Sequence, residues 1–126
     1  MRLLLDTHVF LWCVRDDRQL GKTARASIAN ATEVYVSSAS IWEAAIKQAL
    51  GKLDVDISAL VRAIGGSGFI ELPITARHAA AVSRLPDLHR DPFDRILIAQ
   101  ALSEPLRFLT ADSALKGYSD LVDVVR

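Results

Sequence analysis

Four carboxylate side chains stand beside short apolar runs, at positions where they could gather into one site. They are Asp6, Glu43, Asp94 and Asp112. Asp6 directly follows the leucines at 3–5, and Asp112 follows a run that ends at Leu109. In an open parallel sheet, ligand sites lie outside the carboxyl ends of the strands. If these runs are strands of such a sheet, we expect the carboxylates to meet at one edge, and Asp94 joins them if its helix begins there.

A cluster of four carboxylates would repel itself strongly. At about 4 Å and an effective dielectric constant of about 20, each like-charged pair costs roughly 4 kcal/mol. The cluster must therefore hold protons or bind cations, and nearby helix N-termini favour the ionised forms. Lys47, four residues after Glu43, could supply one local counter-charge. Oxygen ligands without a nearby set of Cys or His ligands select Mg²⁺ or Mn²⁺ over zinc, so the pattern indicates a divalent metal site.

Helix capping is the simpler explanation for most of these acids taken singly. Ser40 and Glu43 have the spacing of a capping box, and Asp112 could cap a short turn that ends before Gly117. Asp6 is the exception, because it directly follows three leucines and capping explains it only weakly.

The acids of the segment 91–94 fit both explanations, helix capping and metal binding. Asp91, Pro92 and Asp94 fit the N-cap, N1 and N3 positions of one helix. We interpret Asp91 as the cap and Asp94 as the more useful ligand. Arg95, on the same turn, is a candidate for a phosphate contact, whereas we interpret His89 as a loop residue without a chemical role.

Apolar runs alternate with stretches of helical periodicity along the whole chain. The expected strands cover residues 3–5, 34–36, 69–72, 106–109 and 121–125, the last at an edge. The expected helices cover residues 9–14, 20–31, 41–50, 57–64, 75–85 and 93–102, and 65–68 reads as a flexible loop. This alternation predicts a single α/β domain over residues 1–126, a three-layer α/β/α sandwich with a central, mostly parallel sheet of four to five strands.

The composition bounds the classes of partner. Lys plus Arg and Asp plus Glu both total 15, so the chain lacks the strongly basic footprint of many nucleic-acid-binding proteins. The single cysteine, the absence of a convincing signal peptide and the lack of a long apolar run indicate a cytoplasmic protein that does not enter a membrane. Apolar residues make up 51% of the chain, which suggests that another chain covers part of the surface; residues 9–14 are the candidate contact.

Four motifs in order along the chain resemble those of the PIN-domain ribonucleases, and among these the toxins of VapBC-type toxin–antitoxin pairs. The motifs read LLLDTHVFLW, SSASIWEAAIK, HRDPFDRILIAQA and FLTADSAL. Each is weak alone, but together they cover the chain from end to end. The family's acidic quartet falls on Asp6, Glu43, Asp94 and Asp112. The supporting hydroxyls fall on Thr7, Ser38 and Thr110, and Asp91 is an additional acid of this subgroup.

The resemblance implies a Mg²⁺-dependent endoribonuclease that cleaves cellular RNA. Asp6 and Asp94 would bind the metal, with Glu43 and Asp112 acting directly or through water. An antitoxin protein would block the acidic pocket, and a homodimer is the usual assembly.

Two other readings stay open. A domain that transfers phosphate through an aspartate also places acids at strand ends, although Asp6-Thr7-His8 lacks a second acid two positions on. A catalytically silent PIN-like binding protein would keep the fold without the reaction, and the complete quartet argues against it.

Overall fold

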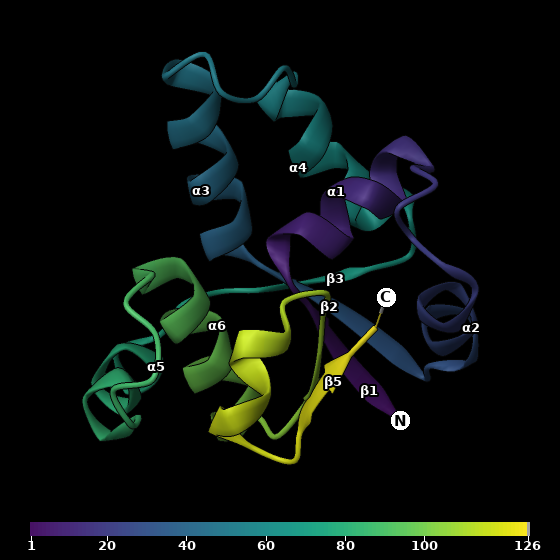
Figure 1. Cartoon of the computed structure of the whole chain (residues 1–126). Helices are drawn as coiled ribbons and strands as arrows, with labels where there is room; N and C mark the ends of the chain where they lie inside the picture. Colours follow the sequence, from purple (N-terminus) through teal and green to yellow (C-terminus); the bar gives the residue numbers. More distant parts are fainter. Residues whose placement is uncertain (126) are drawn as a thin grey trace.

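The computed structural model describes residues 1–125 and contains one five-stranded sheet in the order β3-β2-β1-β4-β5 (Figure 1). All four neighbouring strand pairs are parallel. The strands are β1 (Arg2–Leu5), β2 (Glu33–Ser37), β3 (Ile70–Leu72), β4 (Arg107–Thr110) and β5 (Val122–Val124). The predicted parallel sheet is therefore confirmed, and β5 lies at an edge as expected.

Helices connect the strands and cover both faces of the sheet, as Figure 1 shows. They are α1 (Thr7–Arg15), α2 (Lys22–Asn30), α3 (Ser38–Ala49), α4 (Ile57–Gly66), α5 (Ala76–Ala81), η1 (Val82–Arg84), α6 (Pro92–Ser103) and η2 (Ser113–Tyr118). The helices α1, α2 and α4 pack on one face, and α6 and η2 pack on the other. The expected three-layer sandwich is present.

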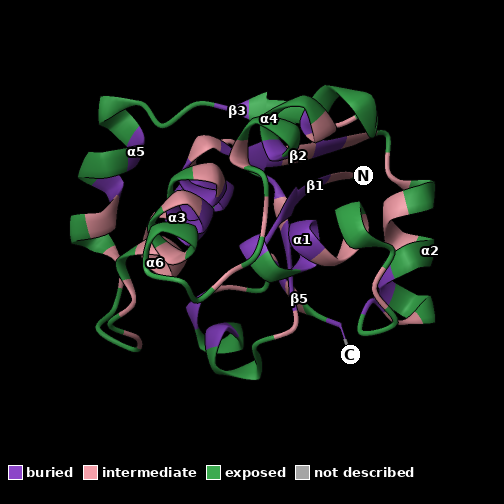
Figure 2. Ribbon diagram, turned by 90° about the horizontal axis from the view of Figure 1, so that it is seen from above, coloured by how far each residue is buried: buried purple, intermediate pink, exposed green. Residues whose placement is uncertain are grey.

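The run 3–5 in β1 explains how one strand serves two cores. Leu3 and Leu5 belong to the core under α1, α2 and α4, whereas Leu4 points to the core under α6 and η2. Side chains alternate between the faces of a strand, so a central strand must be apolar throughout. All three leucines are fully buried. Figure 2 shows the same distribution, with buried residues along the sheet and the exposed ones on the outer helix surfaces.

Several expected elements differ in detail from the structure. Gly65 and Gly66 form the last turn of α4, so the segment 65–68 is not the flexible loop expected from its glycines. Gly68 adopts a φ of 79°, which glycine accepts without strain. The expected helix 75–85 is divided into α5 and the tighter η1.

The apolar helix expected over residues 9–14 is largely a core element. Val9 and Phe10 are buried against the sheet, and only Val14 is exposed. Trp12 and Cys13 are half-buried, so the second half of this stretch is the part that a partner could contact, and that contact stays a prediction. Cys13 is half-buried, and burial raises the pKa of its thiol to about 11.

Among residues 1–125, no helix combines the length and apolar character needed to cross a bilayer.

Candidate active site

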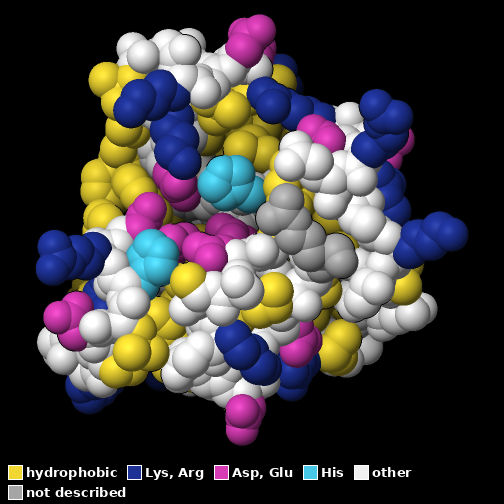
Figure 3. Space-filling model, viewed as in Figure 1, with side chains coloured by type: hydrophobic (Ala, Val, Ile, Leu, Met, Phe, Trp, Pro, Cys, Tyr) yellow, Lys and Arg dark blue, Asp and Glu magenta, His cyan; other side chains and the backbone are white. Residues whose placement is uncertain are grey.

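The four predicted acids meet where β1, β2 and β4 end. Asp6 directly follows β1, Asp112 lies two residues beyond β4, and α3 carries Glu43 away from β2. Asp94 enters the group from the first turn of α6. Figure 3 shows acidic side chains gathered in a hollow on this face, beside histidines.

Asp6 is the most enclosed of the four carboxylates, with 4% of its surface exposed. It occupies the N-cap position of α1, yet within the described chain its side chain makes no capping hydrogen bond. Instead, Oδ2 accepts a hydrogen bond of 2.6 Å from the hydroxyl of Thr110. Burial raises the pKa of Asp6, the charge of Glu43 adds to this, and the hydrogen bond from Thr110 acts in the opposite direction.

Hydroxyl groups hold the strand ends around these acids. The Thr110 hydroxyl also accepts a hydrogen bond from the amide of Asp112 at 3.1 Å. The hydroxyls of Thr7 and Ser40 are 2.8 Å apart and link the start of α1 to α3. Ser40 is therefore a supporting residue that sequence reasoning missed, because it resembled a helix cap.

Ser38, the supporting residue expected from the resemblance, makes a different contact. Its hydroxyl accepts a hydrogen bond from the amide of Ile74 at 3.3 Å. This bond attaches the start of α3 to the segment after β3.

The capping box expected at Ser40 and Glu43 is absent. The helix α3 begins at Ser38, and Ser37 caps it by accepting a hydrogen bond from the amide of Ala39 at 3.0 Å. Glu43 consequently lies in the second turn and is buried. Its Oε2 accepts a hydrogen bond of 2.8 Å from Lys47, which raises the pKa of the lysine. The expected local counter-charge from Lys47 is thus present.

The two acids of the segment 91–94 make different contacts, and the prediction that Asp91 is the cap is confirmed. Asp91 caps α6 by accepting hydrogen bonds from the amides of Phe93 and Asp94. The carboxylate of Asp94 accepts no hydrogen bond from residues 1–125. Burial raises its pKa to about 7, assisted by the charges of Asp6 and Asp91 and then those of the other two acids. Asp112 similarly caps η2 by accepting from the amide of Ala114, as the capping interpretation predicted.

His89, interpreted as a loop residue without a chemical role, lies at this cluster. Its Nε2 is 3.7 Å from Oδ2 of Asp94 and 3.7 Å from Oδ2 of Asp112. The ligand atoms of these three residues all lie within 4.8 Å of one another. Sequence reasoning missed this position, although His89 is only two residues before Asp91. No pattern in the neighbouring residues indicates that this segment faces the turn after β4.

The guanidinium of Arg95 is directed at backbone carbonyls. It donates hydrogen bonds to the carbonyls of Pro86, His89 and Val82, and a further one to the hydroxyl of Tyr118. These bonds fasten the segment 86–89 to α6. The phosphate contact expected from Arg95 would compete with these bonds, so we now assign Arg95 to positioning the segment that holds His89.

The donor set suits a hard divalent cation. Carboxylate oxygens are the ligands that Mg²⁺ and Mn²⁺ prefer. Burial is the main cause of the raised pKa values of Asp6 and Asp94, and the charges of neighbouring acids add to it. Lys47 forms its ion pair with Glu43, and the charges of Asp91 and Asp94 also raise the pKa of the lysine. A cation at the cluster would relieve the remaining repulsion.

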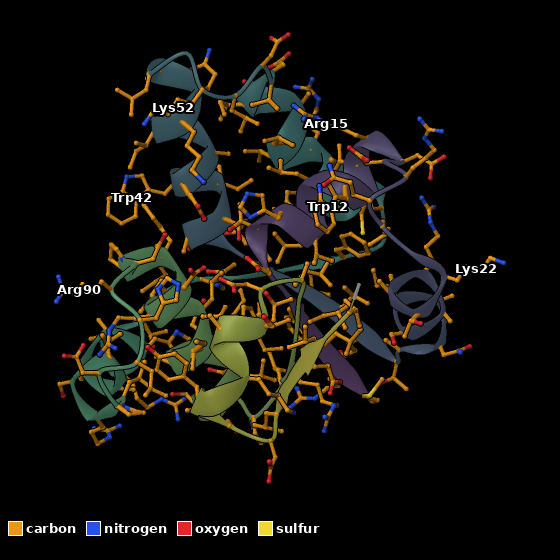
Figure 4. The ribbon with its side chains drawn as sticks, viewed as in Figure 1. Trp12, Arg15, Lys22, Trp42, Lys52 and Arg90 are labelled. Carbon is orange, nitrogen blue, oxygen red and sulfur yellow. The ribbon has the colours of Figure 1, made fainter. Side chains whose placement is uncertain are left out.

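Two adjoining clefts open at the cluster and share His8 and Trp12. One of about 390 Å³ is lined by Asp6, Asp112 and Gln19. The other, of about 310 Å³, runs between α1 and α3 toward basic residues, and its lining includes Arg15, Lys47 and Lys52. Figure 4 labels Trp12, Arg15 and Lys52 on this side of the molecule. An acidic centre is thus continuous with a partly basic, partly aromatic groove.

The family model described as "PIN domain" matches residues 3–121. The chain is 29% identical to a protein of Mycobacterium tuberculosis named Ribonuclease VapC22, and the match covers 92% of this chain and 91% of that protein.

Two solved structures share the fold. VapBC2 from Rickettsia felis, crystallised with a DNA fragment from its promoter, matches with a TM-score of 0.71 at 13% identity, over 99% of this chain and 98% of that chain. FitAcB from Neisseria gonorrhoeae matches with a TM-score of 0.61 at 20% identity, over 89% and 88%.

Proposed function

The chain belongs to the PIN domain family, and on that premise we propose that it is a divalent-metal-dependent endoribonuclease and the toxin of a type II toxin–antitoxin pair. The observation that supports this proposal best is the convergence of Asp6, Glu43, Asp94 and Asp112 beside an open cleft. The name of the relative in Mycobacterium tuberculosis, Ribonuclease VapC22, points to the same reaction.

In this proposal Asp6 and Asp94 hold the metal, and Glu43 and Asp112 assist directly or through water. A bound Mg²⁺ or Mn²⁺ supplies charge that attracts the phosphodiester and lowers the pKa of water. The chain supplies the positioning. Thr110 holds Asp6 by its hydrogen bond, and Lys47 neutralises Glu43, so the remaining negative charge is concentrated on the other acids.

We assign the path of the RNA to the cleft between α1 and α3. Lys52 and Arg15 line it and can contact phosphates, and Trp12 offers an aromatic surface to a base. This local basic groove accounts for RNA binding by a chain whose formal net charge is +0.

Two protein partners are part of the proposal. The solved neighbours from Rickettsia felis and Neisseria gonorrhoeae are VapBC and FitAcB complexes, and we propose that an antitoxin segment occupies the same cleft and directs a basic side chain to the acids. Such a pair would act in the cytoplasm, where cellular RNA is its substrate.

A second copy of the chain is the other proposed partner. Trp42, Ile46 and Leu50 form an exposed apolar stripe along α3, and Trp42 is 60% exposed. Residues four apart lie on the same face of a helix, and the apolar stripes of two copies could pack against each other in a twofold dimer. The rings of Trp42 and Phe93 pack edge to face, with their centroids 5.1 Å apart, beside an apolar groove of about 490 Å³.

The reaction is tested by incubating the purified protein with a structured RNA in Mg²⁺, in Mn²⁺ and in EDTA, beside the Asp6→Asn variant. We expect cleavage by the wild-type protein in either metal, and none in EDTA or by the variant. RNA binding without cleavage in any metal would instead indicate a silent binding protein. A stable acyl-phosphate on the protein would indicate phosphotransfer.

A further inference from the structure

The imidazole of His89 lies at the acidic cluster but is not one of the four acids assigned to the metal. We infer that His89 is a further catalytic residue, whose Nε2–H donates a hydrogen bond to the scissile phosphate and does not bind the metal. This inference rests on the proposed function and adds a residue to that site.

The backbone defines which ring nitrogen carries the proton. The amide of Asp91 donates a hydrogen bond to Nδ1 of His89 at 3.1 Å. Only an unprotonated ring nitrogen can accept a hydrogen bond. In the neutral ring the proton must then be on Nε2, so the ring presents an N–H donor on its opposite side.

That donor lies beside two of the acids. Nε2 lies 3.7 Å from carboxylate oxygens of both Asp94 and Asp112, and within residues 1–125 it has no hydrogen-bond partner. The side chain is 26% exposed, so a substrate can reach it. A phosphate drawn to a cation between these carboxylates would arrive within reach of the Nε2–H.

Metal ligation by His89 conflicts with the same contact. A ligand nitrogen must offer its lone pair, so binding through Nε2 would require the proton on Nδ1. That proton would face the amide N–H of Asp91 and abolish the hydrogen bond between them. The hydrogen bond at Nδ1 therefore favours a site in which carboxylate oxygens bind the metal and the Nε2–H of His89 stays free to donate to the substrate.

The position of the ring is fixed through its own backbone. The carbonyl of His89 accepts hydrogen bonds from Arg95 at 3.3 Å and from the hydroxyl of Tyr118 at 3.4 Å. With the bond at Nδ1, these contacts hold the residue from both sides. A positioned donor stabilises the charge that develops on phosphate oxygens as the phosphodiester bond breaks.

A matched pair of substitutions tests the roles of the two ring nitrogens one at a time. His89→Asn keeps an acceptor near Nδ1 for the amide of Asp91 but removes the outer donor. His89→Gln places an amide N–H near the former Nε2 position but loses the inner acceptor. In RNA cleavage with Mg²⁺, we expect kcat to fall by about 100- to 1,000-fold in His89→Asn, and His89→Gln to be at least about tenfold faster than His89→Asn.

Metal binding supplies a readout independent of activity. We expect the Kd for Mn²⁺, measured by calorimetry without RNA, to change by less than about twofold in His89→Asn. A loss of about tenfold or more would make His89 a ligand and overturn the inference, as would wild-type kcat in His89→Asn.

The ring itself can be observed by long-range ¹H–¹⁵N NMR of the labelled protein. We expect protonated Nε2 and unprotonated Nδ1 in the neutral ring, with and without Mg²⁺, and a shift of the Nε2–H signal when inorganic phosphate is added with Mg²⁺. Loss of the Nε2 proton on adding Mg²⁺, or no response to phosphate, would overturn the inference. These spectra decide the matter even if the wild-type protein cleaves no RNA, an outcome that would overturn the proposed function.

Discussion

The hydroxyl of Thr110 donates a hydrogen bond of 2.6 Å to Oδ2 of Asp6, although 104 residues separate them in the chain. The same hydroxyl accepts a hydrogen bond from the amide of Asp112. One buried side chain at the end of β4 therefore positions an acid after β1 and an acid after its own strand. This link explains why a site composed of residues from distant motifs can be rigid.

Replacing Thr110 with valine should loosen that link while preserving the shape of the side chain. We expect the free energy of unfolding to fall by about 1–2 kcal/mol, and Mn²⁺ to bind more weakly because Asp6 loses the donor that favours its ionised form. Urea unfolding and calorimetry measure the two effects. Thr32→Val, which removes an exposed hydrogen bond to Met1, is the control. Unchanged Mn²⁺ affinity in Thr110→Val would contradict the assigned function of this hydroxyl.

The Asp94→Asn variant should show whether Asp94 serves the reaction or the stability of α6. Asp91 caps α6 and Asp94 accepts no hydrogen bond within residues 1–125, so we expect the variant to fold normally. RNA cleavage should fall by more than about 100-fold, because a direct metal ligand is lost. Asp91→Asn should be milder, since Asn caps almost as well as Asp. Full activity in Asp94→Asn, measured with the same RNA, would refute its assignment as a ligand.

The metal-free protein should lose stability as the pH rises from about 4 to about 7. In the folded state the pKa of Asp94 is raised from 3.8 to about 7, so between these values the folded state binds more protons than the unfolded state. The free energy of unfolding then falls with increasing pH in this window and levels off above it. Asp6, whose pKa is also raised, acts in the same direction.

Urea unfolding in EDTA at about pH 5 and about pH 7.5 measures this dependence. The difference should shrink in Asp94→Asn, and Mg²⁺ should raise the stability more at the higher pH, where the carboxylates are ionised. A stability that increases with pH in EDTA would contradict the raised pKa values of Asp6 and Asp94.

Arg95→Ala should act through the segment 86–89. The substitution removes hydrogen bonds to the carbonyls of Pro86, His89 and Val82, and we expect the free energy of unfolding to fall by about 1–3 kcal/mol. Cleavage should fall with it, because His89 loses its support. A contact with RNA phosphate alone predicts another result: unchanged thermal stability and a KM that depends less on salt. Differential scanning fluorimetry and KM values at two salt concentrations distinguish the two.

Trp42→Glu should disrupt the proposed homodimer. A charge in the apolar stripe on α3 opposes the association of two copies, and we expect light scattering to report a single chain where the wild-type protein reports two. Val61→Glu places the same charge at an exposed apolar position of α4, outside the stripe, and should leave the dimer intact. A wild-type protein that is already a single chain at high micromolar concentration would overturn the dimer.

Local patterns predicted most of the architecture correctly. The run 3–5 is apolar without interruption because a central strand is covered on both faces, and the carboxyl ends of parallel strands share an edge, so acids placed after strands converge. The apolar run and the position of an acid after a strand are features of a short stretch of sequence. They can be recognised without knowing which helices pack against the strand. The segment Asp91-Pro92 likewise marked the start of α6, since an N-cap and a proline at N1 act within one turn.

Residues whose surroundings come from elsewhere in the chain were interpreted less well. Ser40 resembled a cap, but its hydroxyl meets Thr7 of a different helix. Arg95 resembled a phosphate ligand, but its acceptors belong to a segment that folds back over α6. Gly65 to Gly68 resembled a loop, but the chain ends α4 there by hydrogen bonds from the amides of Gly68 and Phe69 to the carbonyls of Gly65 and Ile64.

By itself the sequence predicted the order of the elements and the parallel sheet, because these follow from the periodicity of short stretches of chain. It also placed the four acids beside the expected ends of strands and helices. Only the tertiary structure decided that His89 faces Asp94 and Asp112, and which of its nitrogens the backbone occupies. The distance between side chains on separate elements depends on how helices and loops pack together. That packing is decided by many contacts between segments that are distant in the sequence, so no single segment predicts it.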